Sequence, residues 1–306
     1  MNSLPGQLEK KQLLQDRVSI YQPEQDGRIF PSIPEFRSHE EHRHYLKQRL
    51  VAACRAFALF NLDYGFAGHL TVRDPEHPHL YWTNPMWMRM LRVAHGQVSD
   101  PEHPHLYWTN PMCVHFSRVK MSNLILADHT GTVVQGNYAI NRAGYVLHAA
   151  VHEEHPDIVA MCHAHTEYGT AFASLGRPLD PISQDACAFY EDHVVIKDEA
   201  GQVAVETKAG LSVASHFKGV RAAIHQNHGL LTVSRHSIEA AAFWFIALER
   251  CCKQQLMIEA IGHKPTLVPH DRAIYSREHV GSEYIGWLHF QPIWEQLEAT
   301  QPDMFS

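Results

Sequence analysis

The 306-residue sequence has no long apolar segment. Nowhere do about 18 uncharged apolar residues follow one another, the length that a membrane-spanning helix requires. The amino terminus, MNSLPGQLEKKQLLQDRV, also has no apolar stretch of signal-peptide length. We therefore expect a cytoplasmic protein with no membrane partner.

Basic charge and paired cysteines are scarce as well. The 26 Lys and Arg residues against 33 Asp and Glu residues give a net charge of −7, which disfavours a nucleic-acid partner because such proteins present basic surfaces. The six cysteines form no CxxC pair, as expected of free thiols in a reducing compartment. With 45% hydrophobic and 19% charged residues, the composition predicts a globular protein.

Histidine, by contrast, is abundant, with 25 residues, so that only spacing can select individual candidates. His163 and His165 are two residues apart in a predicted strand, so both side chains project from one face. Alone, such a pair is more often an ordinary surface or core pair. His228 follows 63 residues later (228 − 165) in NHGLLTV, at the end of an apolar strand. Three neutral imidazoles are typical of an open site for zinc or another divalent ion, with His225 as the rival ligand.

The apolar patterns predict helices alternating with strands. We expect a helix from about Glu41 towards Gly65, a strand in GHLTVRD and a hairpin in NLILADHTGTVVQGN. Another helix is expected in RAGYVLHAAVHEEHP and the longest one from Ser237 to Gly262. These elements predict an α/β fold with a polar arm over residues 1–40, a domain over 41–265 and an extension over 266–306.

One segment is repeated letter for letter. DPEHPHLYWTNPM occupies 74–86 and returns at 100–112, an offset of 26 residues (100 − 74). Repeat architectures need at least about three similar units, so a single identical pair indicates a recent tandem duplication or a gene-prediction artefact. We therefore treat about 87–112 as an insertion, with either copy able to hold the native place.

The ordered combination of HAH, a gap of about sixty residues and NHGLLTV before a long helix resembles the class II aldolase/adducin family. The resemblance covers roughly residues 42–262. It implies a three-layer αβα fold, in which a mostly antiparallel central sheet is flanked by helices. It also implies a homo-oligomer, often a cyclic tetramer with sites between subunits. Family members include sugar-phosphate aldolases, homologues that perform oxidative decarboxylation on iron, and non-catalytic adducin heads.

The sequence departs from the aldolase pattern at the position of the catalytic glutamate. Where aldolases have two phosphate-binding serines and a catalytic glutamate, this chain has Arg142, Ala143 and Gly144, and the usual Gly-Asn pair is Gly68 and His69. A glycine cannot move a proton, so the retro-aldol base is missing and a phosphorylated substrate is disfavoured. The stretch INRAGYVLHAAVHEEHPD instead resembles the adducin-like branch.

Further candidates follow the HAH motif. They lie in ISQDACAFYEDH, a loop with which family members line their pockets, sometimes from a neighbouring subunit. In this loop Gln184 takes the place of the aldolase tyrosine. Gln184 can hydrogen-bond but cannot protonate, whereas Tyr190 or His193 can. The competing interpretation is that these are ordinary loop residues without a catalytic role. For His148, one helical turn before His152, we favour a buried, hydrogen-bonded structural residue over a ligand.

These observations predict a divalent-metal-dependent enzyme that performs a lyase-type reaction, aldol cleavage or decarboxylation, on a small non-phosphorylated carbonyl or carboxylate compound. Zinc is the first choice of ion, with iron or manganese as alternatives. Two other functions are open: a non-haem iron oxygenase or decarboxylase, and an adducin-like scaffold without catalysis. A role in the actin cytoskeleton is disfavoured because TQPDMFS stands where adducins continue into a lysine-rich tail.

Overall fold

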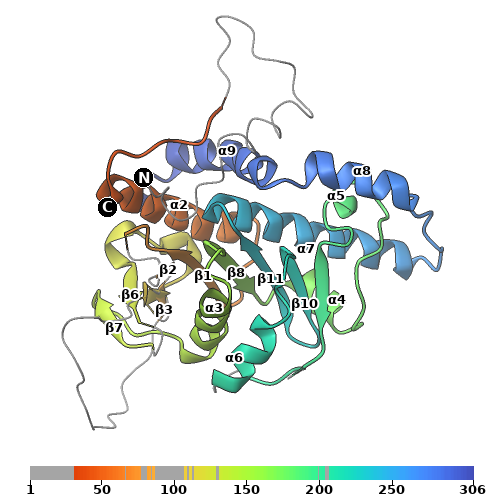
Figure 1. Ribbon diagram of the computed structural model, residues 1–306, viewed down its shortest axis with the longest axis horizontal. Helices are drawn as coiled ribbons and strands as arrows, with labels where there is room; N and C mark the ends of the chain where they lie inside the picture. The colour runs from red at the N-terminus through yellow and green to blue at the C-terminus, as the bar shows by residue number, and fades with distance from the viewer. Residues whose placement is uncertain are drawn as a thin grey trace, which may run out of the picture.

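The computed structural model describes residues 31–306 except 66, 77–80, 84, 87–106, 109, 112–113, 129–130, 199 and 204–206. The fold is α/β, with a central sheet between two layers of helices (Figure 1). This is the three-layer arrangement that the resemblance to the class II aldolase/adducin family implies.

The strands are β1 (Gly68–Arg73), β2 (Tyr81–Thr83), β3 (Pro85–Met86), β4 (Tyr107–Trp108), β5 (Asn110–Pro111), β6 (Ile125–Ala127), β7 (Val133–Gln135), β8 (Ala160–Ala164), β9 (His193–Ile196), β10 (Ala222–His225) and β11 (Gly229–Ser234). The main sheet has the order β4-β6-β2-β1-β8-β11-β10-β9, with β7 also paired to β6. Among its described pairs only β9 and β10 are parallel, so the sheet is mostly antiparallel as expected.

The helices are α2 (His39–Leu59), α3 (Arg142–Glu154), α4 (Glu167–Ala173), α5 (Gln184–Cys187), α6 (Thr207–Ala214), α7 (Ile238–Ala260), α8 (His270–Val280) and α9 (Glu283–Thr300). Short 3-10 turns are η1 (Phe116–Arg118), η2 (Met121–Asn123) and η3 (Pro302–Phe305). The longest helix begins as predicted, because the Ser237 side chain accepts a hydrogen bond from the backbone N–H of Ala240. It ends before Gly262, whose φ of +72° suits a glycine after a helix.

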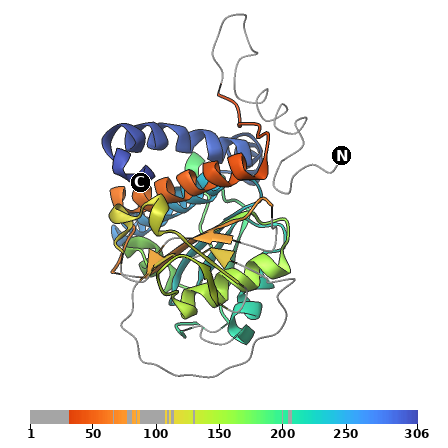
Figure 2. The same ribbon diagram turned by 90° about the vertical axis from the view of Figure 1, so that its left-hand side faces the viewer.

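Helices α2 and α7 cover one face of the sheet, with α9 packed on their outer side, and α3 and α6 cover the other face (Figures 1 and 2). Alternate residues of β8 serve the two faces, as the pleat of a strand requires. Cys162 packs into the core under α2 and α7, whereas Met161 packs into the smaller core under α3 and α6. His163 has the same parity as Met161, so it belongs to the α3 face.

The carboxyl-terminal segment is integral to the larger core. Leu297 of α9 and Met304 of η3 are fully buried in it. Arg55 of α2 also donates a hydrogen bond of 3.0 Å to the carboxylate of Asp303. At the other end of the described chain, the Tyr284 hydroxyl donates to the carbonyl of Pro31, which ties the end of the amino-terminal arm to α9.

The two copies of the duplicated segment lie on either side of β6. Tyr81 of the first copy and Tyr107 of the second both pair with Ala127 in antiparallel register. Most of the insertion, about 87–112, lies outside the described residues. Both copies thus pair with the same residues of β6, but among the described pairings the first copy, in β2, also pairs with β1, whereas the second copy, in β4, ends the strand order.

Among the described helices, none is long and apolar enough to cross a membrane.

Candidate metal centre

The candidate site lies where β8 ends and β11 begins. Strand β8 runs between β1 and β11, so Ala164 is opposite both Gly68 and Leu230. His163 is the fourth residue of β8, and His165 directly follows the strand. His228 lies in the short turn from β10 to β11, in which its backbone N–H bonds to the carbonyl of His225 at 3.0 Å. Backbone pairing thus brings residues 63 positions apart (228 − 165) to one end of the sheet.

The three selected histidines converge. The ring centroids of His163 and His165 are 5.1 Å apart, and those of His228 lie 4.9 and 4.8 Å from them. One ligand atom from each ring can be chosen so that all three lie within 4.8 Å of one another. Among the described His, Cys, Asp and Glu side chains, these three histidines form a group that can hold a metal ion. Three imidazoles with remaining open positions fit one zinc, iron or manganese ion.

The surroundings keep these imidazoles neutral. Burial, with contributions from His228 and His165, holds the pKa of His163 well below its usual value of 6.5. Burial also lowers the pKa of His165, and burial together with His225 and His165 lowers that of His228 to about 3. A neutral imidazole carries a lone pair on one nitrogen, which is the form that ligates metal.

A hydrogen bond orients His163. Its Nδ1 lies 2.9 Å from the carbonyl oxygen of Leu230. A carbonyl only accepts, so Nδ1 carries the proton and Nε2 carries the lone pair. This is the outer contact expected of a metal-binding histidine. The rival His225 instead has its Nε2 2.9 Å from the carbonyl of Asp198.

The place of the missing acid is filled by another imidazole. His69 is opposite His163 in the β1–β8 ladder, so both side chains stand on one face. A Cβ atom added to Gly144 would come within 2.0 Å of Nε2 of His69. Asn141, whose Oδ1 caps α3 by accepting from Ala143, holds the same nitrogen through its Nδ2 at 2.9 Å. The cap fixes the amide orientation, so His69 accepts this hydrogen bond. The sequence marks His69 as unusual but gives no signal of its contact with Gly144.

His148 is buried and hydrogen-bonded, as predicted. Its Nδ1 and the Nε2 of His152 each lie 2.8 Å from the Thr71 hydroxyl. His152 Nδ1 is 3.2 Å from the carbonyl of Ile158, so it donates there and its Nε2 accepts from Thr71. Burial lowers the pKa of both rings well below the usual value. This chain of hydrogen bonds joins α3 to β1.

The structure places the other candidates elsewhere in the chain. The Tyr190 hydroxyl is 3.0 Å from Nδ1 of His270 in α8. His193 begins β9 opposite Ala222, whereas the histidine turn follows the far end of β10. Both His193 nitrogens have structural partners: Nδ1 donates to Phe189 O at 2.6 Å, and Nε2 accepts from Leu179 N at 3.0 Å. Gln184 starts α5 and is exposed.

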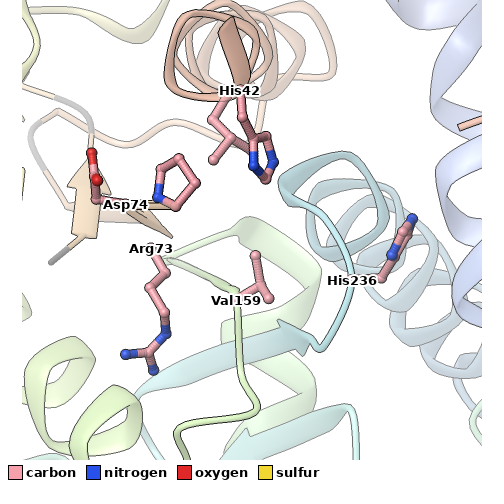
Figure 3. A pocket seen from close by; sticks show the side chains of 7 residues that line it. His42, Arg73, Asp74, Val159 and His236 are labelled. Atoms are coloured by element: carbon pink, nitrogen blue, oxygen red, sulfur yellow. The ribbon is translucent and has the colours of Figure 1, made fainter. Parts of the chain in front are cut away.

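A pocket that is lined by other histidines lies at the opposite end of β1 and β8 (Figure 3). It is lined by His42, Leu46, Arg73, Asp74, Pro75, Val159 and His236. Arg73 points away from His42 and donates to the carbonyls of Ile158 and His152. Asp74 is held by Arg43 at 2.6 Å. Its charged groups therefore serve the fold.

Comparison with known proteins identifies the family. Residues 48–256 match the profile of the class II aldolase and adducin N-terminal domain, which is most of the chain. The chain belongs to the class II aldolase/adducin family. The resemblance drawn from HAH and NHGLLTV is thereby confirmed.

Curated relatives and a solved structure share nearly the full length. Decarboxylase NovR of Streptomyces niveus is 37% identical over 90% of this chain and 92% of its own length. The 4-hydroxy-3-prenylphenylpyruvate oxygenase/4-hydroxy-3-prenylbenzoate synthase of Streptomyces roseochromogenus subsp. oscitans is 37% identical over 89% and 88%. The L-fuculose 1-phosphate aldolase from Glaciozyma antarctica PI12 superposes with a TM-score of 0.75 at 34% identity, covering 90% of this chain and 96% of that one.

Proposed function

We propose that the protein is a divalent-metal-dependent lyase that decarboxylates a small, non-phosphorylated oxo acid. The observation that carries this proposal is the pairing of three converging neutral imidazoles with an acid position filled by His69. Such a site can hold an ion but has no carboxylate at Gly144 to act as a base. The name of the relative NovR, a decarboxylase, supports the same reaction class.

The missing base separates decarboxylation from aldol cleavage. Retro-aldol cleavage starts when a base removes a hydroxyl proton, and the residue in that place is Gly144. A 3-oxo acid needs no such base: its carboxylate leaves as carbon dioxide, the bonding electrons move to the carbonyl oxygen as an enolate, and one proton then returns to carbon. A bound divalent ion supplies the positive charge that stabilises this enolate.

The chain's own residues arrange the site for that step. His163, fixed by Leu230, offers Nε2 as a ligand, and His165 and His228 complete the set. His69, held by Asn141, closes the α3 side beside His163. Zinc is the first choice of ion, with iron or manganese as alternatives, because imidazole serves all three. We also propose a homo-oligomer, a tetramer by resemblance, in which Gln184 or Tyr190 can reach a neighbouring subunit's site, whereas His193 is held by its partners within the chain.

An oxygenase is the second candidate, because the other relative is named as one. A 2-oxo acid cannot form an enolate by simple loss of carbon dioxide, so its decarboxylation here requires dioxygen as a co-substrate. If iron is the bound ion, His163, His165 and His228 would hold it, and it would supply the reaction with dioxygen.

The test begins with elemental analysis of protein purified without added metal. Carbon dioxide release is then measured from oxaloacetate, acetoacetate and aryl 2-oxo acids, with zinc-, manganese- or iron-loaded protein, in air and without oxygen. Metal-dependent release from a 3-oxo acid without oxygen is the expected result. Release only from the aryl 2-oxo acids, only with iron and oxygen, would establish the oxygenase instead. Failure to bind any of the three metals would leave an adducin-like scaffold.

A further inference from the structure

Glu249 is a buried carboxylate in the middle of α7, with 7% of its surface exposed. It accepts three hydrogen bonds from one short segment. Its donors are the hydroxyl of Thr166 and the backbone N–H groups of Tyr168, at 2.9 Å, and Gly169, at 2.7 Å. This segment directly follows His165, so the carboxylate is bonded to the residues that carry a proposed metal ligand.

The arrangement replaces an ordinary helix cap. Thr166 is the N-cap residue of α4, yet its side chain makes no capping hydrogen bond. The first N–H groups of a helix lack partners within the helix, and a cap residue usually supplies them. Here Glu249 supplies them from a different helix, and its negative charge suits the positive end of the helix dipole.

The contact is close because position 169 is a glycine. A Cβ atom on Gly169 would come within 2.6 Å of Oε2 of Glu249 and 2.5 Å of Leu230. Leu230 also accepts the hydrogen bond of His163 and lies two residues after His228. The packed group of Glu249, Gly169 and Leu230 therefore lies beside the segments that carry all three histidines.

We propose that Glu249 is a positioning residue of the metal centre, which holds the turn after β8 so that His165 meets His163 and His228. The inference rests on the proposed metal site and adds to it a residue that does not touch the ion. A carboxylate at this place fixes Thr166 and, through the backbone, the neighbouring His165. Outer contacts of this kind typically change metal affinity by about 10- to 100-fold when they are removed.

Glu239 provides a matched control. It is a fully buried glutamate of the same helix α7, and its carboxylate bonds to the Tyr45 hydroxyl at 2.5 Å and lies 3.6 Å from Arg49. Glu239→Gln and Glu249→Gln thus make the same chemical change in the same helix. An amide keeps the size of the side chain, but its NH2 group cannot accept from a backbone N–H.

The experiment is a cobalt titration of the full-length chain, followed by visible absorption and by competition with a chelator. We expect Glu249→Gln to weaken cobalt binding by about 10-fold or more and to change the absorption spectrum, because His165 is displaced. Glu239→Gln should keep the parent spectrum and an affinity within about twofold, whatever its stability. Thr166→Val, which removes one of the three donors, should shift affinity less and in the same direction.

Unchanged affinity and spectrum in Glu249→Gln would reduce Glu249 to a helix cap and overturn the inference while the metal site stands. Absence of cobalt binding by the parent chain would overturn the proposed function itself. If Glu249→Gln fails to fold, Thr166→Val decides, and an unchanged spectrum there counts against the inference.

Discussion

The two ends of strands β1 and β8 both carry histidines, but they use them differently. At one end, His163, His165 and His228 meet edge to face, with interplanar angles of 70° to 89°. At the other end, His42 stacks on Phe36 with centroids 4.2 Å apart and an angle of 11° (Figure 3 shows its pocket). In the first group one ligand atom of each ring lies within 4.8 Å of the others, whereas the His42 ring packs flat against an aromatic ring. Histidine abundance therefore predicts little, and convergence is what distinguishes a ligand set.

The largest effect should come from removing a converging ring. We expect the metal content to fall from about one ion per chain in the parent to nearly none in His163→Ala, because two imidazoles hold a divalent ion much more weakly than three. His42→Ala, the matched change at the other end, should keep the full ion content. Elemental analysis after dialysis measures both. Equal loss of metal in the two variants would show that the two ends of β1 and β8 do not differ in this way.

A second test concerns the filled acid position. Gly144→Ala should destabilise the protein by about 1–3 kcal/mol, because the added methyl group overlaps His69. In a His69→Ala background the same change should stabilise by up to about 1 kcal/mol, since alanine is the better helix former. The free energies of unfolding of the parent, the two single variants and the double variant, measured in urea at fixed metal content, give this double-mutant cycle. The same sign in both backgrounds would show that His69 does not fill this place.

The opposite end should instead respond to pH. Burial lowers the pKa of His42 from 6.5 to about 4, with Asp74 opposing the shift. The unfolded chain then binds more protons than the folded one, so stability is complete above pH 6.5 and falls as the pH drops towards 4. Between pH 7 and pH 5 the parent should lose about 1 kcal/mol more than His42→Gln, after allowance for partial exposure. Equal losses, measured by urea unfolding, would contradict this.

The smallest effect is expected at the surface near that pocket. Arg235 donates to Asp157 at 2.6 Å, but the Asp157 side chain is 57% exposed. Asp157→Asn should change the free energy of unfolding by less than about 0.5 kcal/mol and leave metal content unchanged, because water screens exposed ion pairs. A loss above about 1 kcal/mol in thermal or urea unfolding would show that Arg235 depends on this partner more than its exposure indicates.

Some features follow from local sequence alone. The spacing of His163 and His165 fixes both on one face of a strand, because the pleat has a period of two. Ser237 and Gly262 mark the limits of α7 through capping chemistry that depends on neighbouring residues only. The motif NHGLLTV, at the end of an apolar strand, adds His228 as the third candidate, and the structure brings it to the other two.

Only the tertiary structure decided the rest of the site. The pairing of β8 with both β1 and β11 places His69 and His228 beside His163, and nothing local to those residues encodes that register. The filling of the acid position by His69 and the capping of α4 by Glu249 join segments some 75 to 80 residues apart. The sequence determined which side chains can ligate an ion. Packing of the strands and helices decided which of them meet, because convergence depends on long-range contacts that residue spacing does not record.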